Sequence, residues 1–337
     1  MGYKIAWIKG DGIGPEISDA TLHAIEALES KHNLNFDIIF YDAGDVCLIK
    51  RGTALPPETI EGFGNADAAI KGPVGETSMD VTVKLRQLFD LYANIRPVKN
   101  YPTIECIKDI DVIIVRENTE DLYKGIEFEI DNTAIALRVI SEYASRRIAR
   151  VSGELASKRT GLVTIVHKSN VLRKTCGLFS RVAKEELSNY HVKVNEMYVD
   201  AASAMLLKYP ERFDVILTTN MFGDILSDEA AQIAGSLGIG PSGNIGDSKA
   251  LFEPIHGAAP DIAGKNIANP YAMILSFKML MEWLADKKSD RRLKEASLVL
   301  ESAVVKALSM GYKTPDIGGD KRTDEIGKSL YNIIKNF

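Results

Sequence analysis

The sequence has few of the features that mark secreted, membrane-bound or disulfide-stabilised proteins. Only three cysteines occur, Cys47, Cys106 and Cys176, and their wide spacing offers neither a disulfide framework nor a CxxC metal motif. No apolar run approaches the roughly 18 residues of a membrane helix, and the first residues predict a short strand rather than a signal peptide. We therefore expect a cytoplasmic protein without a membrane partner.

An excess of charge of one sign is also missing. The net charge is −5, and the basic residues are scattered along the chain. A protein that binds nucleic acid or an anionic membrane would carry a basic patch, so neither partner is expected. Any anionic ligand must instead be bound by a local group of cationic side chains.

The 337 residues, 45% of them hydrophobic, predict two connected lobes without an internal repeat or a flexible linker. Short apolar runs alternate with stretches of helical periodicity through most of the chain, which predicts an α/β fold with largely parallel pairing. The final third is expected to be nearly all helix. The predicted strands are 36–41, 68–71, 112–116, 162–167, 192–197 and 215–217, and the C-terminal helices are 269–284, 291–308 and 323–337.

The first strand is followed by the turn Gly10-Asp11-Gly12-Ile13-Gly14-Pro15. Its glycines are spaced as GxGxG rather than the GxGxxG of a Rossmann dinucleotide fold, and a proline at the start of a helix loses no hydrogen bond. A phosphate-binding turn and a plain tight turn both remain open, because glycine supplies positive φ in either.

Three arginines lie at the edges of apolar segments: Arg86, Arg96 and Arg116. The planar guanidinium forms paired hydrogen bonds with carboxylates, so three converging arginines would bind a di- or tricarboxylate. The alternative is that each one forms an ordinary ion pair within the protein.

Asp224 and Asp228 are four residues apart at the beginning of a predicted helix, so their carboxylates face the same way. Two such groups repel each other unless a cation lies between them, and oxygen ligands suit Mg²⁺ or Mn²⁺. The alternative is that they complement the helix dipole. Lys168 and Asp200 each end an apolar run, where ligands collect in α/β sheets. His256 lies in a loop of small residues and could be purely structural.

Together these motifs resemble the β-decarboxylating dehydrogenases, the family of 3-isopropylmalate, isocitrate, homoisocitrate and tartrate dehydrogenases. The resemblance runs nearly end to end. The segments that carry it are 10–16, 85–86 with 91–97, 115–123, 167–170, 198–201, 220–228 and 256–265.

The resemblance implies a two-lobe, non-Rossmann α/β fold with the active site in the cleft between the lobes. Residues 1–92 and 236–337 would form the cofactor lobe, and residues 93–235 the substrate, metal and dimerisation lobe. It also implies a homodimer or higher homo-oligomer that shares each site, with Lys168 and Asp200 donated by the neighbouring subunit.

By the same resemblance, Arg86, Arg96 and Arg116 would bind the substrate carboxylates, and Asp200, Asp224 and Asp228 would hold Mg²⁺ or Mn²⁺. Lys168 would help to remove the hydroxyl proton, and Tyr123 would protonate the product carbon.

The resemblance places Asp261 beside the adenosine ribose, where a carboxylate binds hydroxyls but repels the 2′-phosphate of NADP, so NAD is the expected cofactor. It also implies that His256, Gly257, Ala259 and Asn269 line the adenosine, with Asp316 nearby.

The substrate is expected to be read by residues just before Arg86. Asp80 and Thr82 stand where isocitrate enzymes carry Ser and Asn, and an acidic Asp80 would repel a third carboxylate. Val83 suits a branched alkyl group, which favours 3-isopropylmalate and a place in leucine biosynthesis. Homoisocitrate, isocitrate and broad specificity remain alternatives. A catalytically silent regulatory subunit is disfavoured because every expected ligand residue is present.

Overall fold

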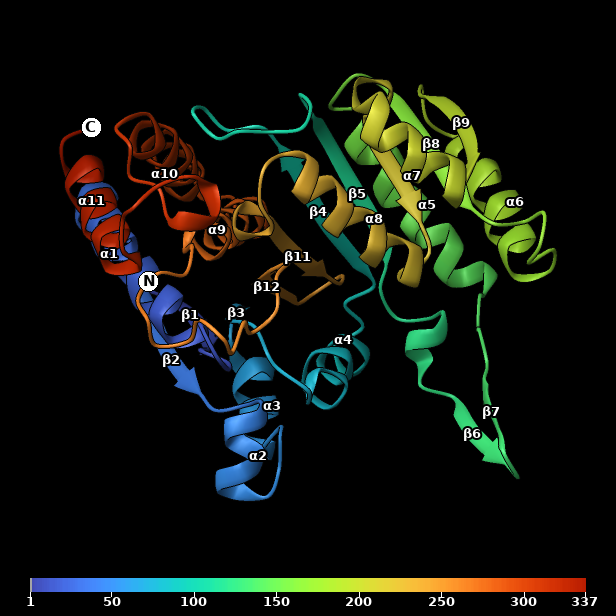
Figure 1. Cartoon of the computed structure of the whole chain (residues 1–337), viewed down its shortest axis with the longest axis horizontal. Helices are drawn as coiled ribbons and strands as arrows, with labels where there is room; N and C mark the ends of the chain where they lie inside the picture. The colour runs from blue at the N-terminus through green and yellow to red at the C-terminus, as the bar shows by residue number, and fades with distance from the viewer. Residues whose placement is uncertain (1) are drawn as a thin grey trace.

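The computed structural model describes residues 2–337 and contains a ten-stranded sheet with helices on both faces, together with a two-stranded arm that projects from the body (Figure 1). The sheet order is β2-β1-β3-β12-β11-β4-β5-β10-β8-β9. The strands of the sheet are β1 (Tyr3–Ile8), β2 (Phe36–Tyr41), β3 (Ala68–Lys71), β4 (Ala93–Lys99), β5 (Asp111–Glu117), β8 (Leu162–His167), β9 (Lys193–Tyr198), β10 (Val215–Thr218), β11 (Pro241–Ile245) and β12 (Ala250–Pro254).

Eleven α-helices cover the sheet within the described part of the chain. Their bounds are α1 (Gly14–His32), α2 (Asp45–Arg51), α3 (Pro57–Asn65), α4 (Lys84–Leu88), α5 (Glu142–Ala156), α6 (Thr175–Leu187), α7 (Val199–Lys208), α8 (Asn220–Ile233), α9 (Tyr271–Lys288), α10 (Arg291–Ser309) and α11 (Thr323–Lys335). None of the helices between residues 2 and 337 has both the length and the apolar character needed to cross a membrane.

The pairing of the strands differs between the flanks and the centre of the sheet. Both flanks are parallel, as expected, but β12, β11, β4 and β5 pair antiparallel to one another. The sheet is therefore mixed, which separates it from the all-parallel Rossmann arrangement. The strands before the centre come from residues 3–71 and 241–254, and those after it from residues 93–218. The lobe boundaries at residues 92 and 236 stay a prediction.

Alternation along the central strands assigns different side chains to the two faces of the sheet, because successive strand residues point in opposite directions. On β4 and β5, Arg96 and Arg116 line a pocket on one face, whereas Ile95 and Ile113 line a second cavity on the other. On β12, Glu253 faces the first pocket and Phe252 the second.

Apolar packing stabilises both halves of the sheet. In the first half, Trp7 and Phe277 are fully buried in a core that α1, α9, α10 and α11 share with the strands. In the second half, α5 and α6 cover one face, while α7 and α8 cover the other.

The arm consists of β6 (Glu127–Ile130) and β7 (Thr133–Ala136) and extends away from the rest of the chain (Figure 1). Its large apolar side chains Phe128 and Ile130 are exposed. A two-stranded hairpin is at best marginally stable in water by itself, so exposed apolar groups on it indicate a surface that packs against something else.

Candidate active site

A pocket of about 230 Å³ lies at the centre of the sheet, between its two halves. Four cationic side chains and two carboxylates are among its lining residues. They are Lys71, Arg86, Arg96, Arg116, Asp224 and Glu253. The surplus of cationic groups makes the pocket a binding site for a small anion with more than one charge.

The three predicted arginines converge in this pocket from three elements. Arg86 projects from α4, Arg96 from β4 and Arg116 from β5, and all three side chains are buried. A Cβ atom on Gly223 of α8 would lie 2.7 Å from the Arg116 side chain, so only glycine lets the helix pack this closely. The three arginines thus line one pocket, and their role in binding substrate stays a prediction.

Their partners inside the protein leave part of their hydrogen-bonding capacity unused. Arg86 Nη2 donates to Glu253 Oε1 at 3.0 Å, and Arg96 lies 3.2 Å from Asp224 Oδ1. Arg86 Nε and Arg116 Nη2 are buried without an acceptor among the described residues. Burial and the nearby charge of Arg96 lower the pKa of Arg116 to about 10. Unused buried donors beside crowded positive charge indicate that an anionic ligand completes the site.

Buried amides connect the cationic groups through the sheet. Arg96 Nε donates to Asn94 Oδ1 at 2.7 Å, and Asn94 Nδ2 donates to Asn244 Oδ1 at 3.0 Å. Asn244 Nδ2 in turn donates to Glu253 Oε1 at 2.8 Å. A network of this kind restricts side-chain motion, so Arg96 and, through Glu253, Arg86 are held in place before any ligand binds.

Tyr123 lines the same pocket from a short 3-10 helix, Leu122–Lys124, that follows β5. Its hydroxyl donates to Asp224, and the Arg116 guanidinium lies 5.0 Å from its ring centroid. Burial raises the pKa of Tyr123, so its hydroxyl stays protonated at neutral pH. The group is therefore available as a proton donor to a ligand in the pocket.

Asp224 and Asp228 project from α8, but neither belongs to its first turn, which contains no acidic residue. Complementation of the helix dipole therefore does not explain them. Burial opposes ionisation of Asp224, but Arg116 and Arg96 outweigh it and lower its pKa. Burial and the neighbouring charge of Asp224 raise the pKa of Asp228.

The donor set fits a divalent cation only in part within one chain. Asp224 and Asp228 offer hard oxygen ligands on one helix, yet residues 2–337 bring no third Asp, Glu, His or Cys to them. Asp200 instead pairs with Lys168, whose Nζ lies 2.6 Å from its Oδ1 on the exposed surface of the same chain. Lys168 and Asp200 are thus close to each other, and neither lines the pocket.

The predicted cofactor residues begin at the pocket edge with His256 and Gly257. The glycine-rich turn supports this loop: Ile13 N donates to Ala258 O at 2.9 Å, and a Cβ on Gly12 would meet that oxygen at 1.9 Å. Burial lowers the pKa of His256, whose Nε2 is buried without a partner in the described chain. A neutral imidazole with an unused ring nitrogen fits a hydrogen-bonding ligand such as an adenine ring.

The other predicted cofactor residues follow the same loop. Ala259 adopts positive φ, and Asp261 is exposed with no hydrogen bond to residues 2–337. Asp316 already accepts hydrogen bonds from Ser236, Thr314 and Asn269, the last at 3.0 Å. Asn269 and Asp316 therefore hold the C-terminal loop, and their contact with a cofactor stays a prediction.

The segment before Arg86 forms a π-helix over Met79–Val83. It places Thr82 and Val83 on the pocket wall, both of them buried. Asp80 is exposed and does not line the pocket, so the repulsion expected from it has no structural basis. The substituent of a ligand would meet the Thr82 hydroxyl and the Val83 methyl groups.

Two charged residues of the pocket were not predicted, Lys71 and Glu253. Lys71 Nζ lies 2.8 Å from Glu253 Oε2, and both side chains are buried. Each follows three apolar residues near the carboxyl end of a strand, Ala68-Ala69-Ile70 and Ala250-Leu251-Phe252. A charged residue near the carboxyl end of an apolar strand could have identified both residues in the sequence, because ligands bind at such strand ends in α/β sheets.

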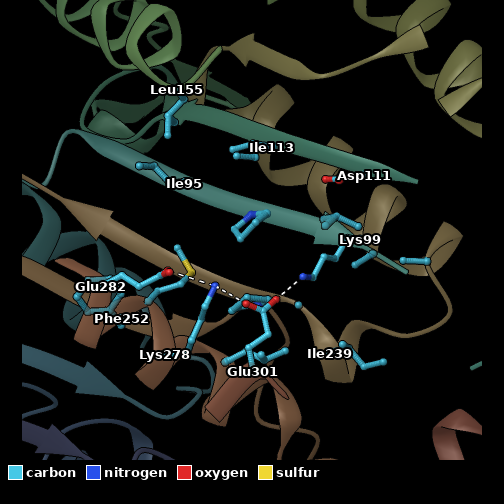
Figure 2. A pocket seen from close by; sticks show the side chains of 18 of the residues that line it. Ile95, Lys99, Asp111, Ile113, Leu155, Ile239, Phe252, Lys278, Glu282 and Glu301 are labelled. Atoms are coloured by element: carbon cyan, nitrogen blue, oxygen red, sulfur yellow. Dashed lines mark hydrogen bonds and ion pairs between the residues drawn. The ribbon is translucent and has the colours of Figure 1, made fainter. Parts of the chain in front are cut away.

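A larger cavity, about 430 Å³, lies on the opposite face of the central strands and contains none of the predicted site residues. Figure 2 shows Lys278 between Glu282 and Glu301, with Lys99 on the far side of Glu301. Its remaining walls are mainly apolar, including Ile113 and Phe252.

The mixed sheet and the cationic pocket, with its tyrosine hydroxyl and paired aspartates, define an α/β enzyme that acts on a small polyanionic acid. The chain belongs to the isocitrate/isopropylmalate dehydrogenase family, whose model matches residues 4–330, and it is a decarboxylating dehydrogenase.

Similar proteins include a 3-isopropylmalate dehydrogenase of Saccharolobus solfataricus, 50% identical over 99% of this chain and 100% of that protein. A homoisocitrate dehydrogenase of Methanocaldococcus jannaschii is 44% identical over 98% of both chains. The solved structure of isocitrate dehydrogenase from Methylococcus capsulatus superposes with a TM-score of 0.92 at 37% identity and covers 99% of each chain. The family and its α/β fold are confirmed by these likenesses.

Proposed function

We propose that this enzyme oxidises and decarboxylates 3-isopropylmalate to 2-oxo-4-methylpentanoate, with NAD and Mg²⁺ or Mn²⁺, as a step of leucine biosynthesis. The observation that carries the proposal is the buried Val83 beside three arginines in one pocket. An isopropyl group gains about 1–3 kcal/mol from burial against such a wall, whereas a carboxylate placed there loses its hydration. The 50% identity to a 3-isopropylmalate dehydrogenase supports the same choice.

In this reaction, different residues of the chain bind the substrate and transfer protons. Arg86, Arg96 and Arg116 bind and orient the two carboxylates of the malate core, and Arg86 Nε and Arg116 Nη2 have unused donors for this purpose. Lys168 takes part in removing the C2 hydroxyl proton. After CO₂ has left, Tyr123 donates its proton to the enolate carbon.

Asp224 and Asp228, joined by Asp200 of a second copy, would hold the divalent ion, which supplies positive charge that acidifies the C2 hydroxyl and stabilises the developing enolate. NAD supplies the acceptor for the C2 hydride. Asp261 selects NAD over NADP because its exposed carboxylate accepts from ribose hydroxyls and repels a 2′-phosphate.

A second copy of the chain is needed for a complete site. Lys168 and Asp200 lie outside the pocket that holds Tyr123 and Asp224. Exposed apolar side chains occur on the arm, at Phe128 and Ile130, and on α8, at Ile225. These surfaces suit a homodimer interface that brings Lys168 and Asp200 of one subunit to the pocket of the other.

Homoisocitrate is the second candidate, because the pocket wall also carries the hydroxyls of Thr82 and Ser78. These can donate to a further carboxylate. The relative of 44% identity acts on that acid, as its name states.

The deciding experiment measures kcat/KM for NADH formation with Mg²⁺ and 3-isopropylmalate, homoisocitrate, isocitrate and malate. We expect 3-isopropylmalate to be preferred. A preference for a tricarboxylate would instead indicate that Thr82 and Ser78, not Val83, bind the third substituent of the substrate. Asp224→Asn should reduce turnover by orders of magnitude and weaken Mn²⁺ binding measured by calorimetry. Normal Mn²⁺ affinity in that variant would contradict its assignment as a metal ligand.

Site sharing can be tested with two inactive variants, Lys168→Ala and Asp224→Asn. If subunits share sites, a mixed dimer contains one intact site, so co-expression should restore about one quarter of wild-type activity. Because unshared sites would leave both pockets damaged, no recovery in verified mixed dimers would reject the sharing.

A further inference from the structure

A buried carboxylate that the proposed reaction does not use lies two residues before Tyr123. Asp121 is fully buried, and its backbone has φ 68° and ψ −148°, a conformation that L-residues rarely adopt. Its side chain accepts from Leu122 N at 3.0 Å and from Met221 N at 3.2 Å. The unfavourable backbone persists because this carboxylate is bound from several sides at once.

The main partner of Asp121 is Arg138, which follows the arm. Arg138 Nη2 donates to Asp121 Oδ2 at 3.0 Å, and its Nε lies 2.7 Å from Oδ1. The same Nη2 donates to Thr219 Oγ1 at 2.7 Å, and the guanidinium lies 4.7 Å from the ring centroid of Phe222. Arg138 therefore connects the base of the arm to the beginning of α8.

The backbone continues this connection. Asp121 N donates to Val139 O at 2.8 Å, so the two segments also form a β-bridge. Asn220 Nδ2 donates to Glu120 O at 3.1 Å, and Arg116 Nε donates to Asn220 Oδ1 at 2.8 Å. The Asp121–Arg138 pair thus contacts the 3-10 turn that carries Tyr123 and the first turn of α8. The neighbouring Glu120 carbonyl binds Asn220, which in turn accepts from Arg116.

We propose that Asp121 and Arg138 are a positioning pair that fixes the Tyr123 hydroxyl against Asp224 and ties this geometry to the base of the arm. The proposal rests on the proton-donor role given to Tyr123 above. A shift of about 1 Å in a reacting group can reduce turnover about a hundredfold, and both ends of the Tyr123–Asp224 contact depend on this pair.

A second buried aspartate that pairs with an arginine in the same half of the sheet provides the matched control. Asp214 is buried and pairs with Arg159, whose Nε lies 2.5 Å from Oδ1. Asp214 also accepts from Thr160 N at 3.0 Å. This pair lies before β10, whereas Thr219 and α8 follow that strand, so Asp214 reaches no residue of the pocket.

The kinetic test is a double-mutant cycle in the full-length protein with 3-isopropylmalate. Asp121→Asn should lower kcat by about 30-fold or more and change the KM for NAD by less than about twofold. In the Tyr123→Phe background the same substitution should lower kcat by less than about threefold, because the group that it positions is gone. Arg138→Lys should retain more activity than Arg138→Gln. Fully multiplicative losses would overturn the proposal.

Asp214→Asn should lower the melting temperature at least as much as Asp121→Asn but leave kcat within about threefold of wild type. An equal loss of kcat in both variants would mean that any buried-pair defect disturbs turnover, and the positioning role would be rejected.

Amide hydrogen exchange provides a readout that does not depend on the substrate. Asp121→Asn and Arg138→Gln should accelerate exchange in residues 122–125 and 221–224, whereas Asp214→Asn should not. Unchanged exchange there would overturn the proposal even for an enzyme inactive on all four acids. Inactivity of the wild type would by itself contradict only the proposed function.

Discussion

The two cavities on opposite faces of the central strands differ in whether their charged side chains have partners within the protein. The smaller one contains buried arginine donors without acceptors, although it holds only about 230 Å³. The larger one holds about 430 Å³, and its charged side chains Lys99 and Lys278 both pair with Glu301. Unused hydrogen-bonding capacity, not volume, therefore marks the functional pocket.

The same strands build both cavities, so alternation alone separates the chemical site from the structural one. Arg96 and Ile95 are neighbours in sequence, yet they face different cavities. Two substitutions of the same residue type on opposite faces of the sheet should therefore have different effects. The one in the smaller pocket should lower activity, and the one in the larger cavity should lower stability.

The largest contrast is expected between Arg116→Gln and Arg159→Gln. Arg116→Gln removes a buried charge to which we assign substrate binding, so we expect a cost of about 2–5 kcal/mol and a kcat/KM lowered by roughly 30-fold to several thousand-fold. Arg159 lines the larger cavity and pairs with Asp111 and Asp214, so its loss should reduce the melting temperature while kcat/KM stays within about threefold. Comparable losses of kcat/KM in the two variants would contradict the claim that only the smaller pocket takes part in the reaction.

Glu301→Gln should reduce stability and leave activity unchanged, which is the reverse of the effect expected for Arg116→Gln. It breaks the partly buried pairs with Lys278 and Lys99, which should destabilise the protein by about 1–3 kcal/mol without changing kcat. The control is Glu295→Gln, whose partner Arg291 is nearly fully exposed, and its effect should stay below about 0.5 kcal/mol. Thermal unfolding and steady-state kinetics measure both quantities.

The pH dependence sharpens this test. Burial opposes ionisation of Glu301, but Lys99 and Lys278 outweigh it and lower its pKa below the ordinary 4.5. The stabilisation is therefore present above pH 4.5 and is lost as pH falls through the lower folded-state pKa. The difference in melting temperature between wild type and Glu301→Gln should shrink from pH 7 to pH 3. A difference that grows toward low pH would contradict this assignment.

The smallest effect is expected at the substrate wall. Val83→Ala removes two methyl groups from the pocket, which costs about 1–2 kcal/mol of binding and lowers kcat/KM for 3-isopropylmalate about 5- to 30-fold. Malate lacks the isopropyl group, so its kcat/KM should change little. Val46→Ala, at an exposed site on α2, is the control. An equal loss on malate would show that Val83 acts only by holding Arg86.

Sequence patterns identified most strands that contain an apolar run, including β3 and β5, which carry the site residues Lys71 and Arg116 near their ends, and missed three strands of the main sheet whose apolar run is short or interrupted. β3, β5, β8 and β10 were predicted within two residues. The three missed strands are β4, β11 and β12. Asn94 and Arg96 interrupt the apolar character of β4, Ser242 and Asn244 that of β11, and Glu253 that of β12. A strand whose apolar run is short or broken by polar residues does not show the pattern of a buried strand.

The arm was missed for a related reason. β6 and β7 are exposed on both faces, so no buried face imposes a period of two on their sequence. The two strands pair with each other locally. That the arm packs against another surface can be inferred only from the structure, in which Phe128 and Ile130 are exposed.

The sequence by itself determined which chemical groups this protein has. Arg86, Arg96, Arg116, Tyr123, Asp224 and Asp228 stand in motifs whose spacing and order identify the family without any coordinates. Local signals suffice there, because each motif is a strand end or one turn of a helix.

Only the tertiary structure decided which of these groups meet. It brought the arginines to Tyr123 and Asp224, left Lys168 and Asp200 together on the surface, added Lys71 and Glu253, and removed Asp80 from the pocket. The contacts within the pocket join residues more than a hundred positions apart, such as Arg116 with Asp224 and Arg86 with Glu253. Long-range contacts are set by how the whole sheet is ordered and packed, which no local pattern encodes.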